Sequence, residues 1–222
     1  MNIVCYTFSM KYATAITLLI ILATFVLGAA LYPHLPAHLA THWNMQGNVN
    51  HFTPKFWSVF GLPFIMIGIA ALFLLIPLID PLKKNITAFR LHFDLFVVLL
   101  MLFLFYAYLL VIIWNMGNHF NMNEALVPAL GALFYYIGVL MAHAQPNWFV
   151  GIRTPWTLSN TTVWRDTHRL GGRLYKIAGL IAVLGFFVPQ YALWVAVIPL
   201  LIVSLFLIIY SYVDFQSINR RT

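Results

Sequence analysis

Charged residues are scarce in this chain, and acidic ones are the scarcest. Of its 222 residues, 63% are hydrophobic and 8% are charged, with 12 Lys and Arg against 5 Asp and Glu. Soluble domains carry about 25% charged residues, so the few charges here exclude a water-exposed surface over most of the chain. Cysteine is nearly absent as well. Cys5 stands alone, which excludes an intramolecular disulfide.

The shortage of carboxylates argues against an enzyme. Glu124 is the only glutamate, and the aspartates are expected at the cytoplasmic ends of apolar runs or in cytoplasmic loops. General acid and base groups at that surface would not meet the histidines expected on the other side of a bilayer. We predict no catalytic residue and no cofactor, and keep a metal-dependent intramembrane hydrolase as an alternative.

Histidine spacing raises the question of a metal site. His34, His38 and His42 are four residues apart, and on a helix this spacing would place them on one face that favours zinc. A helix can begin near Pro36 but cannot continue through it, which leaves His34 outside. The same segment holds no cysteine, aspartate or glutamate to complete a ligand set, so we predict no metal.

Apolar runs are what the sequence has in abundance. Several are about 20 residues long, enough to cross a hydrocarbon core of about 30 Å as a helix. The fifth is short and contains Lys176 near its start, where a lysine can still reach the headgroups. We predict an all-α integral membrane protein with about six transmembrane helices, at Tyr12–Tyr32, Phe56–Ile79, Leu95–Trp114, Leu126–Ala144, Leu174–Val188 and Tyr191–Val213.

The positions of lysine and arginine set the expected orientation, because basic loops resist translocation. With the N-terminus inside, Lys55 is the one basic residue outside, and the other eleven face the cytoplasm. The Arg220-Arg221 tail then requires an even number of crossings. We expect both termini to be cytoplasmic and the protein to lie in the bacterial cytoplasmic (inner) membrane. The basic residues form no nucleic-acid patch, so no direct contact with nucleic acid is expected.

The external segment His34–Lys55 is too long and too polar to be a simple connection. The residues of Asn44–Asn50 favour a turn, because asparagine side chains bond to nearby backbone and glycine adopts positive φ. Aromatic rings around the segment favour the membrane interface. The candidate residues of this external loop are His42, Asn44, Gly47 and Lys55.

The internal segment Pro146–Arg173 is the more informative loop. Its second half predicts a short helix, with Ser159 or Asn160 as N-cap and Gly171 at the C′ position. One face of that helix holds Trp164, Thr167, His168 and Gly171, and another holds Arg165, Arg169 and Arg173. The arginine face is typical of a helix lying on anionic headgroups. Arg153, beside Pro155 and two tryptophans, is a candidate for binding a carboxylate or phosphate through two parallel hydrogen bonds from its guanidinium group.

These two loops resemble a known family. The run from Gly151 to Ser159, followed by Val163-Trp164 and residues 167–172, resembles the signature of the SdpI/YfhL family of membrane immunity proteins. The external loop resembles that family's N-terminal domain of unknown function, except that Asn50 stands where many relatives are expected to carry aspartate. The signature and partner-binding residues carried over are Arg153, Thr154, Pro155, Trp156, Thr157, Trp164, Thr167, His168, Arg169, Gly171 and Gly172.

The resemblance implies a division of the chain and a function. Residues 1–92 would form a two-helix unit with the external His/Asn loop, and residues 93–222 a four-helix unit with the cytoplasmic Arg/Trp loop. The implied function is protection against a membrane-active peptide toxin outside, with signalling to a small cytosolic repressor as a further implication. A transporter or channel subunit is an alternative, although the central thirds of the expected spans carry no charge.

Overall fold

The computed structural model describes residues 3–220 of the chain, and helices dominate it. Two short strands and three 3-10 turns (Tyr32–His34, Gly185–Phe187 and Pro189–Tyr191) complete the elements. In chain order, the helices and strands are α1 (Ile3–Leu31), β1 (His38–Trp43), β2 (Val49–Pro54), α2 (Lys55–Ile79), α3 (Lys83–Ala88), α4 (Arg90–Asn115), α5 (Met122–His143), α6 (Pro155–Ser159), α7 (Thr161–Leu184) and α8 (Ala192–Asn219).

Six of the described segments are helical, long and apolar enough to cross a membrane, which confirms the predicted all-α multi-pass fold. Their outer surfaces are covered with large apolar side chains; Leu201, Ile202 and Leu205 on α8 are each more than 60% exposed. Such a surface is unfavourable in water and suits hydrocarbon. The chain is therefore a multi-pass membrane protein.

The fifth span corrects two predictions. It does not begin at Leu174, and the arginine-bearing segment before it is not a separate short helix ended by Gly171. Helix α7 runs unbroken from Thr161 to Leu184. Gly171 and Gly172 lie inside it because they let helices approach closely. A Cβ at Gly172 would lie 2.8 Å from the carbonyl oxygen of Gly138 on α5.

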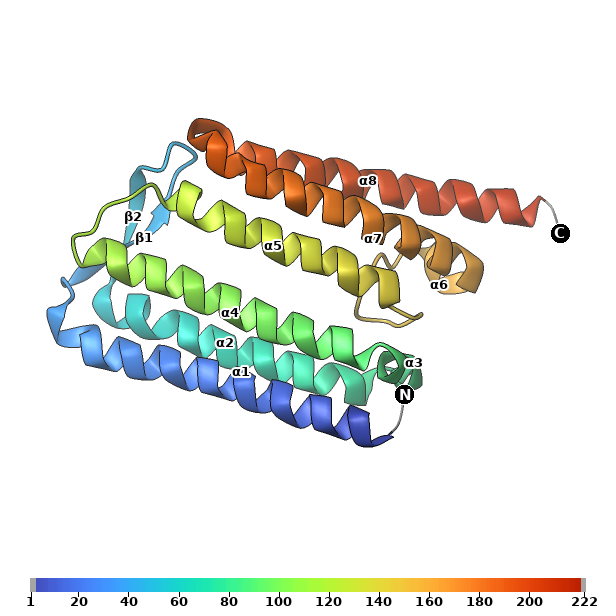
Figure 1. Cartoon of the computed structure of the whole chain (residues 1–222), viewed down its shortest axis with the longest axis horizontal. Helices are drawn as coiled ribbons and strands as arrows, with labels where there is room; N and C mark the ends of the chain where they lie inside the picture. The colour runs from blue at the N-terminus through green and yellow to red at the C-terminus, as the bar shows by residue number, and fades with distance from the viewer. Residues whose placement is uncertain (1–2, 221–222) are drawn as a thin grey trace.

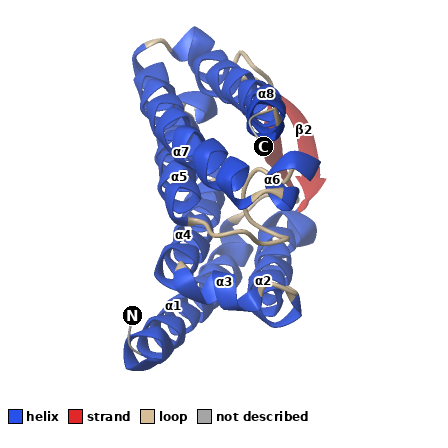
Figure 2. Cartoon of the chain, turned by 90° about the vertical axis from the view of Figure 1, so that its right-hand side faces the viewer, coloured by secondary structure: helices blue, strands red, loops and turns tan. Residues whose placement is uncertain are grey.

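Across the view of Figure 1 the long helices appear in the order α1, α2, α4, α5, α7 and α8, and α1 packs against α4 as well as against α2. Helix α5 lies between α4 and α7. The β-hairpin sits at one end of the bundle, and α3, α6 and both chain ends lie at the other. Figure 2 looks onto that second end. The even number of crossings brings both ends of the described chain to the same surface. The proposed division at residue 92 stays a prediction.

A cluster of buried aromatic and aliphatic side chains lies at the end of the bundle that carries α3 and α6. Phe89 and Phe93 from the α3–α4 region meet Trp164 from α7 and Leu140 from α5, all nearly fully buried. Aromatic side chains bury large apolar areas. This cluster therefore joins the first half of the chain to the second and supports the loop described next.

Candidate functional site

The signature loop (residues 144–160) is organised around two stacked rings of α7. The rings of Trp164 and His168 are 3.9 Å apart between centroids and 15° from parallel. The Trp164 indole N–H donates to the carbonyl of Ala144 at 2.9 Å, just past the end of α5. Both side chains are almost completely buried. The predicted common face of Trp164, Thr167, His168 and Gly171 is thereby confirmed as the packed face of α7.

Both nitrogens of the His168 ring are hydrogen-bonded to backbone groups. The Ile152 backbone N–H donates to Nε2 at 3.0 Å. Nδ1 lies 2.8 Å from the Trp164 carbonyl oxygen. An N–H donor facing Nε2 requires that nitrogen to be unprotonated, so the proton resides on Nδ1. His168 therefore fastens the loop to α7 and has no ring nitrogen free for a metal or for proton transfer.

Gly151 is the residue that allows this contact. Its φ is +108°, in the region that residues with a side chain rarely adopt. A Cβ built at this position would lie 2.2 Å from Nε2 of His168. The glycine is needed both for the turn and for the space it leaves to the ring.

The Thr154-Pro155-Trp156-Thr157 run forms and caps the short helix α6. Thr154 and Thr157 make a reciprocal capping box, with Pro155 in the first helical turn. The Thr154 hydroxyl lies 3.0 Å from that of Ser211 on α8. The Trp156 ring lies 5.0 Å from that of Tyr212 on the same helix. These signature residues therefore fix α6 to α8.

Two residues outside the predicted set, Asp80 and Asn85, hold the loop to the first half of the chain, and a third, Asn147, stabilises the loop internally. The Asp80 carboxylate accepts from the backbone N–H groups of Leu82 and Trp148, at 2.6 and 3.0 Å. The Asn85 amide donates to the Pro146 carbonyl at 2.7 Å, and Asn147 bridges backbone groups within the loop itself. The bonds that Asp80 and Asn85 make to the loop join residues more than 60 positions apart, so they leave no local pattern in the sequence.

The arginines lie on the outside of this packed loop. Arg153 is exposed, and its guanidinium donates to the Trp148 carbonyl. Arg165, Arg169 and Arg173 form the predicted exposed face of α7, and the N-cap at its start is Asn160, whose side chain accepts from the N–H groups of Thr162 and Val163. Arg165 pairs with Asp166 at 3.0 Å. Arg165 and Arg169 line a cleft of about 630 Å³ beside the end of α5.

At the other end of the bundle, the segment predicted as an external loop forms an antiparallel hairpin of β1 and β2, the outer hairpin (residues 38–54). His38 and His42 therefore lie on a strand, and the described residues contain no group of three metal-ligating side chains. The predicted turn is confirmed. The Asn44 side chain accepts from two turn N–H groups, and Gly47 has φ +81°. Lys55 lies over the Tyr32 ring, 4.7 Å from its centroid.

Asparagines at the helix ends hold the outer hairpin in place. Asn115, the last residue of α4, accepts from the Ala40 N–H at 2.8 Å and donates to the Ala40 carbonyl at 3.0 Å. Asn123 on α5 donates to the carbonyls of Asn44 and Met45 at 3.1 Å each. His42 bonds through Nδ1 to the Asn50 side chain at 2.6 Å. Asn115 and Asn123 were not among the predicted site residues.

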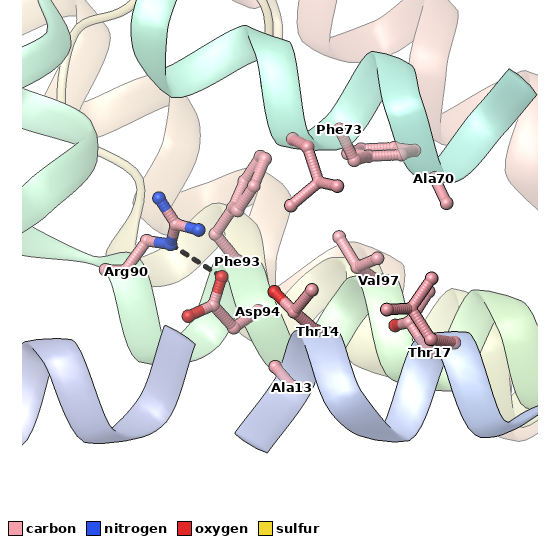
Figure 3. A pocket seen from close by; sticks show the side chains of 11 residues that line it. Ala13, Thr14, Thr17, Ala70, Phe73, Arg90, Phe93, Asp94 and Val97 are labelled. Atoms are coloured by element: carbon pink, nitrogen blue, oxygen red, sulfur yellow. Dashed lines mark hydrogen bonds and ion pairs between the residues drawn. The ribbon is translucent and has the colours of Figure 1, made fainter. Parts of the chain in front are cut away.

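A buried ion pair lies at the signature-loop end of α4. From the sequence, Arg90 is expected in a loop and Asp94 at the end of a span. Arg90 Nε and Asp94 Oδ1 are 2.6 Å apart, and both side chains are 5% exposed. Figure 3 shows them at one end of a cavity between α1, α2 and α4, with Thr14 of α1 beside Asp94. The two charges neutralise each other, which lets them lie in a low-dielectric setting. Helix α4 begins at Arg90, so both residues belong to the span.

The architecture defines the class of protein first: a helical multi-pass membrane protein with an anchored hairpin at one surface and a packed aromatic loop at the other. Comparison with known protein families then narrows this class. Residues 143–211 match the SdpI/YfhL protein family, and residues 19–67 match DUF1648, a domain of unknown function. The predicted resemblance is confirmed, and the chain combines a DUF1648 segment with an SdpI/YfhL segment.

A full-length relative agrees with these matches. The chain is 24% identical over 206 residues to "Immunity protein SdpI" of Bacillus subtilis (strain 168), a match that covers 92% of this chain and 96% of the relative. No solved structure matches the chain. The DUF1648 match contains the outer hairpin, and the SdpI/YfhL match contains the signature loop and the arginine face of α7.

Proposed function

We propose that this protein protects a bacterial cytoplasmic membrane against a membrane-active peptide toxin, and that the peptide meets the protein at the outer hairpin. The supporting observation is the similarity to an immunity protein across nearly the whole of both chains. Protection of this kind requires binding and no bond cleavage. A cytosolic repressor as a second partner stays a prediction.

The two edges of the outer hairpin differ in a way that favours peptide binding. The outer edge of β1 is closed, because the Asn115 side chain occupies both backbone groups of Ala40. Ala40 is opposite Phe52 in the register. In an antiparallel pair, two directly opposite residues either both point their N–H and C=O groups toward each other or both point them away from each other. The N–H and C=O of Phe52 therefore point to the other edge, that of β2.

The β2 edge lies beside exposed aromatic rings. Phe52, Phe56 and Trp57 are 56%, 48% and 61% exposed, and the last two are in edge-to-face contact at 5.3 Å. An extended peptide can add to an exposed strand through main-chain hydrogen bonds while apolar side chains find neighbouring surface. Rings of this kind also favour the lipid interface, where an amphipathic peptide accumulates.

The experiment compares toxin-sensitive cells with and without the protein, using a dye that reports membrane potential during challenge with the toxin peptide. We expect cells that make the protein to keep their potential. Equal depolarisation in both would contradict the proposed immunity function.

Two variants of Phe52 then locate the contact. Phe52→Pro removes an N–H that points away from β1, so the hairpin keeps its ladder while the free edge loses a donor. Phe52→Ala removes the ring and keeps the donor. We expect Phe52→Pro to abolish protection at equal protein levels and Phe52→Ala to reduce it partially. Full protection by Phe52→Pro would reject the strand edge as the binding surface.

A further inference from the structure

The arginine cleft at the signature-loop end offers a site of a different kind, which does not depend on the immunity function. It lies between the end of α5 and the start of α7 and has a volume of about 630 Å³. Arg165, Arg169 and the polar side chains of Gln145 and Thr162 line it, and no carboxylate is among its lining residues. The cleft is therefore electropositive.

The polar groups at the floor of the cleft already have hydrogen-bond partners within the protein. The Trp164 indole donates to the Ala144 carbonyl, and both nitrogens of His168 are bonded to backbone. The Asn85 amide donates to the Pro146 carbonyl. Any ligand must therefore be held by the groups at the rim, chiefly the two guanidinium groups.

Arg169 lacks a countercharge. Arg165 pairs with Asp166, whereas Arg169 has no acidic partner among the described residues and its side chain is exposed. The 22 residues of α5 span about 33 Å, close to a hydrocarbon thickness of about 30 Å, so its end marks the membrane boundary. The Trp164 to Ala144 bond places Trp164 at that boundary. Arg169 is five residues further along α7, about 7.5 Å toward the bilayer.

The character of the exposed face of α7 changes along its length. Toward the cytoplasm-facing end it carries arginines at positions 165, 169 and 173, and further on it carries Ile177, Leu180 and Leu184, which are 54%, 57% and 58% exposed. Residues spaced by three or four lie on one face of a helix. This sequence of cations followed by aliphatic side chains matches a phospholipid, with its phosphate at the arginines and an acyl chain along the aliphatic part.

We propose that the cleft binds the phosphate headgroup of an anionic phospholipid, with Arg169 as the principal contact. A guanidinium gives a phosphate two parallel charge-assisted hydrogen bonds, and an exposed arginine at this depth is stabilised by pairing with an anion. A net-anionic headgroup leaves the phosphate uncompensated. A choline headgroup supplies its own cation, so a zwitterionic lipid binds the cleft more weakly.

The test is native mass spectrometry of the delipidated full chain, titrated with phosphatidylglycerol or with phosphatidylcholine of the same acyl chains. We expect about tenfold tighter binding of phosphatidylglycerol by the unaltered protein, because no cation within that headgroup compensates the phosphate that Arg169 binds. Arg169→Gln should remove that preference. Arg220→Gln, which removes the same charge from the exposed end of α8 at the same surface, should change it less than about twofold.

A second variant and two competitors keep the result decisive. Arg169→Lys keeps the positive charge but loses the paired N–H donors of the guanidinium. We expect it to retain part of the lipid preference even if Arg169→Gln folds poorly. Inorganic phosphate in large excess should not displace the lipid; displacement would identify a soluble phosphate as the ligand and contradict the proposal. Displacement of the lipid by an acidic peptide at low concentration, or an unchanged lipid preference in Arg169→Gln, would overturn it.

Discussion

The outer hairpin and the signature loop lie at opposite ends of the same helices and are held in different ways. The signature loop is fastened by buried side chains that bond to one another and to backbone, around Trp164 and His168. The outer hairpin is held by asparagine side chains at the helix ends and by Leu39, which is fully buried beside Val59 and Ile112, and it leaves one strand edge open. The difference indicates that the signature loop is built for rigidity and the hairpin for contact.

The largest effect is expected at Gly151. Gly151→Ala places a methyl group within 2.2 Å of His168 Nε2 at a residue with φ +108°. Strain at such a residue, together with loss of the His168 bond, should lower the free energy of unfolding by about 3 kcal/mol or more. Thermal unfolding in detergent micelles measures the loss.

Gly117 provides a matched control. Its φ is +101°, and a Cβ there meets no atom within 4 Å. Gly117→Ala therefore carries the backbone strain alone, about 1 kcal/mol. Equal destabilisation by the two substitutions would show that the contact between Gly151 and His168 does not stabilise the loop.

A smaller and more local effect is expected from Asn115→Ala. This change leaves both backbone groups of Ala40 without their partner, at a cost of about 1–3 kcal/mol. Hydrogen exchange should become faster across residues 38–54 and stay unchanged across residues 144–160. Asn123→Ala, which removes bonds to the turn carbonyls alone, should affect only the turn. Uniform acceleration at both ends of the bundle would contradict the independence of the two regions.

The sequence predicted those features that depend on composition or on neighbouring residues. Six spans followed from apolar length, and the packed and arginine faces of α7 followed from helical spacing. The turn at Asn44 and Gly47 and the cap at Asn160 followed from local hydrogen-bonding chemistry. All of these are confirmed by the structure.

The features that sequence reasoning missed depend on distant partners. The strand character of residues 38–43 rests on pairing with β2 and on Asn115, 75 residues away from Ala40. Gly171 looked like a helix end because its role, close packing against α5, becomes visible only with the neighbouring helix in place. Arg90 and Asp94 were assigned to a loop and a span end because their mutual neutralisation across one helical turn was not recognised.

The proposed function requires the two regions to face opposite sides of the membrane, with the outer hairpin away from the cytoplasm. A Cys5→Ser background removes the single native thiol and permits one new cysteine at a time, at exposed Gln46 in the hairpin or at exposed Ser159 in the signature loop. A membrane-impermeant maleimide applied to intact cells should label Gln46→Cys directly and Ser159→Cys only after permeabilisation. Direct labelling of both positions, or of Ser159→Cys alone, would contradict the account.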